Sequence, residues 1–256
     1  MMTPLKSTLR SLAFLTRFPP VDGAFRGGDH PLGEDVPAFP LAGLVAALPS
    51  AILLLTLPEL GISALLAAVL SVALSVWVTG ALHEDGLGDV ADGLFGHLPP
   101  ERALTVMKDS RVGSYGALAL ILSVVARIAL LAELVTHSPV AAALALLGAA
   151  AYSRGLMALL WASLPSADIG GLADRVGRPT RRAGWISAAL GGLIFAASAA
   201  IGFGWGAMLL GLAFALLKFL GFRRWLKRRL GGQTGDTLGA VQQLTEMAAL
   251  FGLCLA

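Results

Sequence analysis

Six long apolar runs dominate this sequence, and each is about long enough to cross, as a helix, the roughly 30 Å hydrocarbon core of a bilayer. The six runs cover 39–58, 62–82, 116–136, 139–163, 185–203 and 205–222. A seventh, 238–255, is apolar only towards its end. Apolar residues make up 56% of the chain and charged residues 14%, whereas soluble domains have about 45–50% and about 25%. The sequence therefore predicts an all-α fold, a polytopic integral membrane helix bundle of about six to seven transmembrane helices.

The first 20 residues, MMTPLKSTLRSLAFLTRFPP, contain basic residues but only a short apolar core, which Thr16, Arg17 and Pro19 interrupt. We therefore expect no cleaved signal peptide. The segment is typical of an amphipathic helix that lies at the membrane interface. We expect residues 1–256 to form one transmembrane domain that carries the activity. The single Cys254 excludes a disulfide within the chain.

Basic residues are distributed unequally between the connections that join the apolar runs. Of the 19 Lys and Arg residues, 16 lie before the first run or in the three long polar connections, and none lies in the three short connections. By the positive-inside rule, the N-terminus and the long connections face the cytoplasm. The predicted cytoplasmic segments are 19–38, 83–115, 164–184 and 223–237, and the predicted far-side connections are 58–62, 136–139 and 203–205.

This distribution predicts a multi-pass protein of the cytoplasmic (inner) membrane with its polar site facing the cytoplasm. The net charge of +3 then reflects topology and contact of the chain with anionic lipid headgroups, so it requires no nucleic-acid partner. The other three basic residues, Arg127, Arg154 and Lys218, fall inside predicted spans. A cation there is costly and usually has a partner or a function.

The segment HEDGLGDVADGLFGH, residues 83–97, places four carboxylates beside the second apolar run. Because each residue of an α-helix turns about 100°, Asp85, Asp89 and Asp92 share one face and Glu84 lies off it. Carboxylates so close repel each other unless a cation binds between them. Mg²⁺ binds carboxylate oxygens together with water and substrate phosphates. We therefore predict that the three aspartates are metal ligands, the alternative being a solvated acidic loop.

Two histidines, His83 and His97, flank this acidic segment. His83 points roughly 160° away from the aspartate face if the segment is helical. The spacing of the histidines and carboxylates matches no common zinc pattern. We interpret both histidines as structural.

The segment MKDSRVGSYG, residues 107–116, offers two cations that suit phosphate, Lys108 and Arg111. Asp109 is either a further metal ligand or the ion-pair partner of Arg111. The alternative interpretation of the whole segment is a basic patch beside the membrane that only sets topology.

The segment GGQTGDTLGAVQQLTE, residues 231–246, is polar where the last apolar run should begin. We expect Asp236 to cap the last helix. Glu246 lies about ten residues further into that helix, where a lone charge is costly. We expect it to line the same cytoplasm-facing cavity as Asp236, with Arg154 as its counter-charge. A purely structural bridge between Glu246 and Arg154 is the alternative.

A predicted acidic metal site with cations nearby, at a membrane, is typical of enzymes that transfer phosphoryl groups, because metal ions and cations neutralise the phosphate charge. The three motifs HEDGLGDVADGL, MKDSRVGSYG and LGGQTGDTLGA, with FLTRFPP and FPLAGL before them, resemble cobalamin synthase, the adenosylcobinamide-GDP ribazoletransferase family, over essentially the whole chain. The resemblance implies a membrane enzyme that joins α-ribazole, or its 5′-phosphate, to adenosylcobinamide-GDP with Mg²⁺ and releases GMP. It implies small-molecule substrates and contact with the lipid bilayer, and leaves open whether the protein is a monomer or a homo-oligomer.

The resemblance assigns most of the candidate site residues, and Arg154 joins them as the expected partner of Glu246. The expected catalytic residues are Asp85, Asp89, Asp92, Lys108 and Arg111, the first three also being the metal ligands. The expected substrate-binding residues are Ser110, Gly113, Arg154, Gly235, Asp236 and Glu246. The chain departs from the family pattern at Glu84, where an apolar residue is usual, and at Gln243, where Glu is common, so we assign Gln243 no catalytic role.

Two other functions stay open at this point. A CDP-alcohol phosphotransferase also uses a helix-borne aspartate cluster, but its D-G-x-x-A-R motif is not matched by the residues after Asp85. A cation-coupled transporter would explain charges inside spans, but transporter sites usually lie near the bilayer midplane within repeated halves, and no repeat is visible here.

Overall fold

The computed structural model describes residues 3–25, 30–96 and 98–255, and so leaves the predicted structural role of His97 outside the described residues. Within these ranges the chain forms helices and connecting turns, with one isolated bridge between Ser166 and Gln233 and no β-strand. The α-helices are α1 (Pro4–Leu15), α2 (Asp22–Phe25), α3 (Phe39–Glu59), α4 (Ala64–Thr79), α5 (Leu82–Leu94), α6 (Pro100–Met107), α7 (Ser114–His137), α8 (Pro139–Ser163), α9 (Leu172–Arg175), α10 (Arg181–Arg229) and α11 (Gly235–Cys254). Two 3₁₀ turns, Leu32–Glu34 and Val36–Ala38, precede α3. The all-α prediction is confirmed.

Four of the described helices, the span that includes α3 together with α7, α8 and α10, are long and apolar enough to cross a membrane. The bent pair α4 and α5 passes the same test as one broken span. The 49 residues of α10 contain a break at Gly204, whose φ of 84° is left-handed, so α10 consists of two arms that correspond to the predicted runs 185–203 and 205–222. The expected seventh span, α11, is not among these helices; it carries Asp236, Glu246 and two glutamines.

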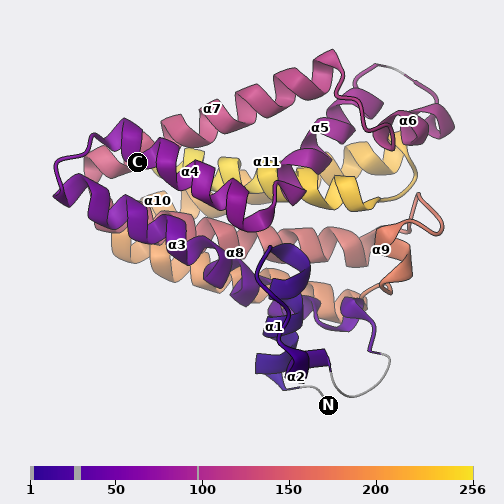
Figure 1. The fold of residues 1–256 in the computed structure, drawn as a ribbon, viewed down its shortest axis with the longest axis horizontal. Coiled ribbons are helices and arrows are strands. Elements are labelled where there is room, and N and C mark those ends of the chain that lie inside the picture. Colours follow the sequence, from indigo (N-terminus) through magenta and orange to yellow (C-terminus); the bar gives the residue numbers. More distant parts are fainter. Residues whose placement is uncertain (1–2, 26–29, 97, 256) are drawn as a thin grey trace.

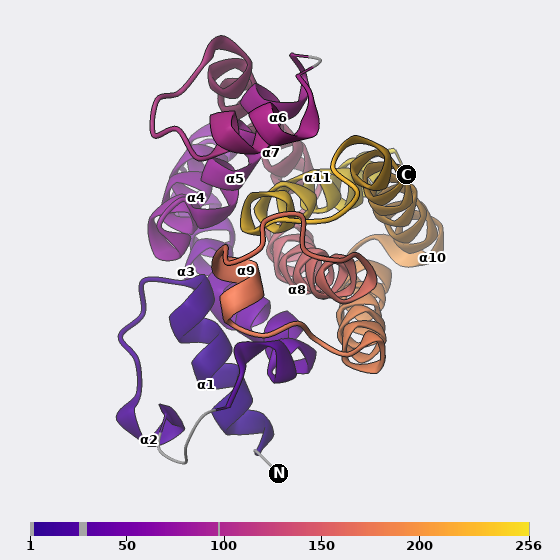
Figure 2. The same cartoon turned by 90° about the vertical axis from the view of Figure 1, so that its right-hand side faces the viewer.

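The central helix of the bundle is α8, which is buried almost throughout and packs against α3, α10 and α11. Small residues allow this close packing. A Cβ on Gly155 would lie 2.6 Å from the carbonyl oxygen of Ser187 in α10, and one on Gly191 would lie 2.7 Å from that of Ala151 in α8. Figure 2 shows α8 enclosed by its neighbours in a view along the bundle.

The polar elements gather at one end of the bundle. In Figure 1, α6 and α9 lie at the right-hand end, opposite the connection between α3 and α4 at the left. Helix α1 crosses the bundle instead of running along it, the orientation expected of an interfacial helix. Its Arg10 forms a 2.7 Å ion pair with the buried carboxylate of Asp35, which ties α1 to the start of α3.

The long polar connections contain more helix than the sequence suggested. Segment 83–115 forms α5 and α6, and α5 is inclined by 88° to α4. Gly80 and Ala81 form this corner with φ of 66° and 61°. Segment 223–237, which we expected to be a loop, is helical as far as Arg229 and again from Gly235. No Gly or Pro interrupts residues 223–229, five of which are Arg or Lys, so α10 continues beyond its apolar part.

Candidate active site

The three aspartates of the acidic motif lie on α5, as their spacing predicted. Asp85 is exposed, while Asp89 and Asp92 are half-buried. The carboxylate of Asp92 accepts hydrogen bonds of 2.8 Å from the backbone N–H groups of Gly113 and Gly116. These groups belong to the N-terminus of α7, where backbone N–H groups lack helical partners and attract negative charge. Asp92 therefore fastens α5 to α7, a contact that its role as a predicted metal ligand did not include.

Asp85 meets Asp236 where α5 packs against the start of α11. This approach depends on Gly86, because a Cβ there would lie 2.6 Å from the carbonyl oxygen of Asp236. Our expectation that Asp236 caps α11 was wrong. Thr234 caps the helix instead, by accepting a hydrogen bond from the N–H of Thr237. The carboxylate of Asp236 is thereby left for the site.

Both carboxylates line a cavity of about 310 Å³, which we call the acidic cavity. Its polar lining also includes Lys108, from the end of α6, and Asp168, from the loop between α8 and α9. The ammonium of Lys108 lies 2.6 Å from the carboxylate of Asp168. The rest of the lining is mainly apolar, with Phe14, Phe39 and Trp161 among its residues. Four of the predicted site residues thus meet in one cavity, namely Asp85, Lys108, Gly235 and Asp236.

Burial and neighbouring carboxylates raise the pKa of two aspartates beside this cavity, Asp89 and Asp236. Helix α5, with 13 residues, is too short to cross a bilayer by itself, and Asp89 lies near its middle. Partial burial, followed by the charges of Asp85, Asp236 and Asp92, raises the pKa of Asp89 to about 7. Burial likewise raises the pKa of Asp236. No Lys or Arg among the described residues forms an ion pair with Asp85, Asp89 or Asp236.

The structure resolves the two roles left open for Asp109. Its carboxylate pairs with Arg111, the shortest contact being 2.6 Å, and accepts a hydrogen bond from the backbone N–H of Arg111. These hydrogen bonds lower the pKa of Asp109 to about 2. Ser110, Arg111 and Gly113 are exposed, and none of them lines the acidic cavity. The second motif thus contributes Lys108 to this cavity.

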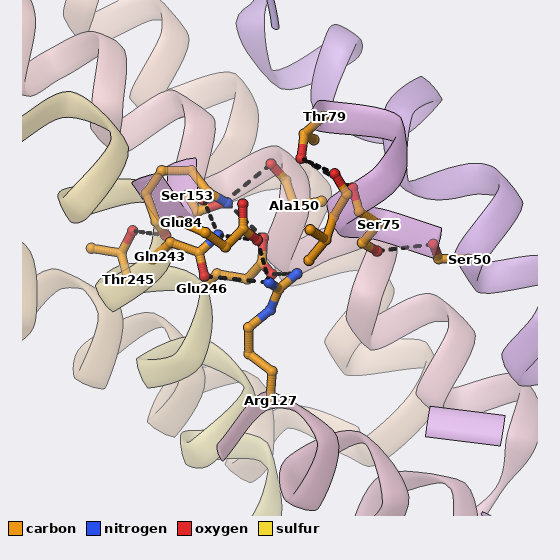
Figure 3. A network of polar contacts seen from close by, with 12 residues as sticks. Ser50, Ser75, Thr79, Glu84, Arg127, Ala150, Ser153, Gln243, Thr245 and Glu246 are labelled. Atoms are coloured by element: carbon orange, nitrogen blue, oxygen red, sulfur yellow. Dashed lines mark hydrogen bonds and ion pairs between the residues drawn. The ribbon is translucent and has the colours of Figure 1, made fainter. Parts of the chain in front are cut away.

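A second group of charged residues lies deeper in the bundle and is almost completely buried. We call Glu84, Arg127, Arg154 and Glu246 the charge network (Figure 3). Arg127 on α7 lies 2.6 Å from Glu84 on α5 and 3.2 Å from Glu246 on α11. Arg154 on α8 lies 3.8 Å from Glu246. Two arginines are therefore matched by two glutamates, and four helices are joined at one point.

The charge network corrects two expectations for Glu246. Arg154 is indeed within ion-pair distance of it, but Arg127 is nearer. Glu246 also does not share a cavity with Asp236. It lines a separate internal cavity of about 20 Å³ with Arg127 and Arg154, and His83 borders both cavities. The reason is geometric: Glu246 lies ten residues beyond Asp236 along α11, which places it about 15 Å deeper in the bundle.

Sequence reasoning missed the roles of Glu84 and Asp168. Glu84 was set aside because it lies off the aspartate face, yet this orientation directs it into the bundle. Gln243 donates a 3.0 Å hydrogen bond to Glu84, so the two positions at which the chain departs from the family pattern are in contact. Nothing in the sequence pattern marks Asp168 as a site residue. Its position at the cavity depends on a contact between distant segments, in which the N–H of Ala167 donates to the carbonyl oxygen of Gln233 at 2.8 Å.

Comparisons with known proteins cover almost the whole chain. The family model described as cobalamin-5-phosphate synthase matches residues 7–254. The adenosylcobinamide-GDP ribazoletransferase of Sinorhizobium sp is 47% identical over 260 residues, which cover 96% of this chain and 95% of that protein. Those of Rhizobium meliloti (strain 1021) and Brucella ovis are 48% and 42% identical, each aligning with at least 95% of both chains. No solved structure matches. This chain is a member of the cobalamin-5-phosphate synthase family.

Proposed function

We propose that this chain is a membrane enzyme of cobalamin biosynthesis that joins α-ribazole, or its 5′-phosphate, to adenosylcobinamide-GDP and releases GMP. Its relatives are named for this activity over nearly their full length. One structural observation supports the proposal most directly. A single cavity at the polar end of the bundle is lined by Asp85, Lys108, Asp168 and Asp236. A CDP-alcohol phosphotransferase and a cation-coupled transporter, the two alternatives, lack this support.

The acidic cavity has the chemistry of a site for Mg²⁺. Burial and the charges of Asp85, Asp236 and Asp92 raise the pKa of Asp89, and burial raises the pKa of Asp236. No described Lys or Arg forms an ion pair with Asp85, Asp89 or Asp236. The described residues contain no preformed group of three metal-binding side chains. This arrangement suits Mg²⁺, which commonly takes one or two carboxylates and completes its coordination with water and substrate phosphates. We propose Asp85 and Asp236, which line the cavity, as its first ligands and Asp89, on the same face of α5, as a third that approaches when the ion binds. Asp92 is a fourth acidic neighbour that holds α5 in place.

The reaction is a displacement at the phosphorus attached to cobinamide. A hydroxyl oxygen of the ribazole forms the new P–O bond, the P–O bond to GMP breaks, and the hydroxyl proton is lost. When bound, Mg²⁺ supplies charge neutralisation to the diphosphate and stabilises the leaving oxygen. Lys108 is placed to neutralise phosphate charge once substrate replaces Asp168 as its partner. By holding the metal ion, the aspartates would position the diphosphate against the attacking hydroxyl.

The acidic cavity lies at the cytoplasmic face of the inner membrane in this proposal. Two observations support it: the basic residues concentrate in the segments at the polar end of the bundle, and the helices that border the cavity include α1, α6 and α9, which are not spans. By the positive-inside rule that end faces the cytoplasm. A cysteine introduced at Arg178 after replacement of Cys254 should therefore resist a membrane-impermeant reagent applied to intact cells, and strong labelling there would reverse the orientation.

The activity is tested with purified protein in detergent, adenosylcobinamide-GDP and α-ribazole, with and without Mg²⁺. We expect GMP and the joined corrinoid in equal amounts, and neither product after chelation of the metal. The same assay with α-ribazole 5′-phosphate decides which acceptor is preferred. Absence of GMP release with both acceptors in the presence of Mg²⁺ would contradict the proposed function.

A further inference from the structure

The acidic cavity has two chemically different parts. The polar part consists of Asp85, Lys108, Asp168 and Asp236. The apolar part consists of residues from α1, α3, α8 and α9, including Phe14, Phe39, Met157, Trp161, Leu172 and Ala173. Phe39 and Trp161 pack together with ring centroids 6.3 Å apart. The indole N–H of Trp161 donates to the carbonyl oxygen of Ala173 at 3.2 Å. These two groups are therefore already paired, and this part of the wall has few free hydrogen-bonding groups for a polar ligand.

The volume of about 310 Å³ limits which part of the substrates can enter. It lies at the lower end of the range for small-molecule sites, about 300–1,000 Å³. A corrin macrocycle is too large to be enclosed there. Three flat heterocycles remain, the guanine and the adenine of adenosylcobinamide-GDP and the dimethylbenzimidazole base of α-ribazole.

Polarity distinguishes dimethylbenzimidazole from the other two bases. Guanine and adenine carry several donors and acceptors around their edges, and each one left unpaired in an apolar cavity costs free energy. Dimethylbenzimidazole has one free ring nitrogen and two methyl groups, and otherwise presents apolar surface. Dimethylbenzimidazole therefore fits this apolar wall at a lower desolvation cost than the other two bases.

We propose that the apolar part of the acidic cavity binds the benzimidazole base of the ribazole substrate and sets the enzyme's preference for that base. The proposal rests on the function proposed above. With the base against Phe39 and Trp161, the ribose extends towards Asp85 and Asp236, where the diphosphate of the second substrate binds. The guanine then lies outside this cavity.

The test compares two acceptors that differ only by two methyl groups, the ribosides of 5,6-dimethylbenzimidazole and of benzimidazole, at saturating adenosylcobinamide-GDP. Methyl groups buried in an apolar site should give the unaltered protein a preference of about tenfold or more in kcat/KM for the dimethyl compound. Ala173→Leu narrows the apolar part, and we expect it to reduce the preference to about one or to reverse it. Leu172→Ala removes a contact and should reduce the preference to about threefold.

The matched control is Ile169→Ala, since Ile169 lies in the same loop, is 91% exposed and does not line the cavity. It should retain the full preference. Leu172 is 56% exposed, so Leu172→Ala should fold even if Ala173→Leu does not. All variants should keep their KM for adenosylcobinamide-GDP.

An unchanged preference in folded variants, or a rise in the KM for adenosylcobinamide-GDP instead, would overturn the proposal and in the second case assign the cavity to guanine. These outcomes differ from a failure of the proposed function, in which the unaltered protein releases no GMP with either riboside.

Discussion

Glu84 and Asp85 are neighbours in the sequence, yet they belong to two regions with opposite electrostatics. Glu84 is 5% exposed and forms an ion pair with Arg127 in the charge network. Asp85 is exposed at the acidic cavity and has no ion-pair partner among the described residues. The turn of about 100° between successive helical residues separates them. Among the described residues, the two buried arginines of the charge network are matched by two glutamates. Asp85 and Asp236, which form no ion pair there, line the cavity where we propose that a cation and a diphosphate bind.

This contrast indicates a division of labour. The charge network joins α5, α7, α8 and α11 inside the bundle, where an unpaired charge would be very costly. The acidic cavity keeps carboxylates close together at some cost in stability, as expected of a site prepared for a charged ligand. We therefore expect substitutions in the cavity to affect activity and substitutions in the network to affect stability.

The largest effect on activity should come from Asp85→Asn. We propose Asp85 as a ligand of the Mg²⁺ that neutralises the reacting phosphate. Its loss should therefore lower kcat/KM for GMP release by about 10²–10³-fold. The unfolding temperature should stay the same or rise, because one of several repelling carboxylates is removed. The control is Glu101→Gln, because Glu101 is exposed on α6 and does not line the cavity; this variant should retain normal activity. If Asp85→Asn lowers kcat/KM by less than tenfold, the acidic cavity is not the site of the reaction and the contrast with the charge network fails.

The largest effect on stability should come from Glu246→Gln. This change leaves Arg154 without a carboxylate partner and Arg127 with only Glu84. Stranding a buried charge costs about 3–5 kcal/mol, which corresponds to roughly 6–20 °C in unfolding temperature, measured in detergent. Activity per folded molecule should fall less than tenfold. If Glu246→Gln keeps its full stability but loses turnover, the charge network takes part in catalysis, which contradicts the structural role given to it here.

A third prediction concerns moving the carboxylate partner of Arg127 from α5 to α11, which tests whether the charge network stabilises the fold. The side-chain oxygen of Gln243 lies 3.4 Å from Arg127, so Glu at this position can replace the charge that Glu84→Gln removes. We expect the double variant Glu84→Gln, Gln243→Glu to recover at least half of the stability lost in Glu84→Gln alone. Additive losses in this double-mutant cycle would show that the two positions do not share Arg127.

The smallest predicted effect is on the pH dependence of Mg²⁺ binding. Because the pKa of Asp89 is raised to about 7, cation binding must displace a proton below that pH. The affinity for Mg²⁺ should rise about tenfold from pH 6 to pH 8 and level off above. The same raised pKa makes the metal-free protein lose stability as the pH rises from about 4 to about 7. Asp89→Asn should flatten the binding profile, and an affinity independent of pH in the unaltered protein would contradict the account.

The sequence predicted the parts of the fold that depend on local pattern. Hydropathy identified α3 and α8 almost to the residue, and the 3.6-residue spacing placed the aspartates on one face of α5. The short connection 203–205 contains the break at Gly204. Each of these features depends on residues close together in the chain, which periodicity can reveal.

What the sequence could not predict depends on contacts between distant segments. The preference of Glu246 for Arg127 over Arg154 requires the depth and rotation of three helices. The 88° corner before α5, which turns Glu84 inwards, depends on a left-handed Ala81, a conformation that sequence does not predict for a non-glycine residue. Asp168 enters the cavity only because its loop bridges to Gln233.

Binding of Mn²⁺, a spectroscopic substitute for Mg²⁺, tests the central claim most directly. Free Mn²⁺ is measured by electron paramagnetic resonance during titration of the unaltered protein, Asp85→Asn and Glu84→Gln, each at a temperature where it is folded. We predict that Asp85→Asn loses the site, with at least about a tenfold weaker affinity, while Glu84→Gln binds as the unaltered protein does. Normal binding by Asp85→Asn, or its loss in folded Glu84→Gln, would contradict the separation of the acidic cavity from the charge network.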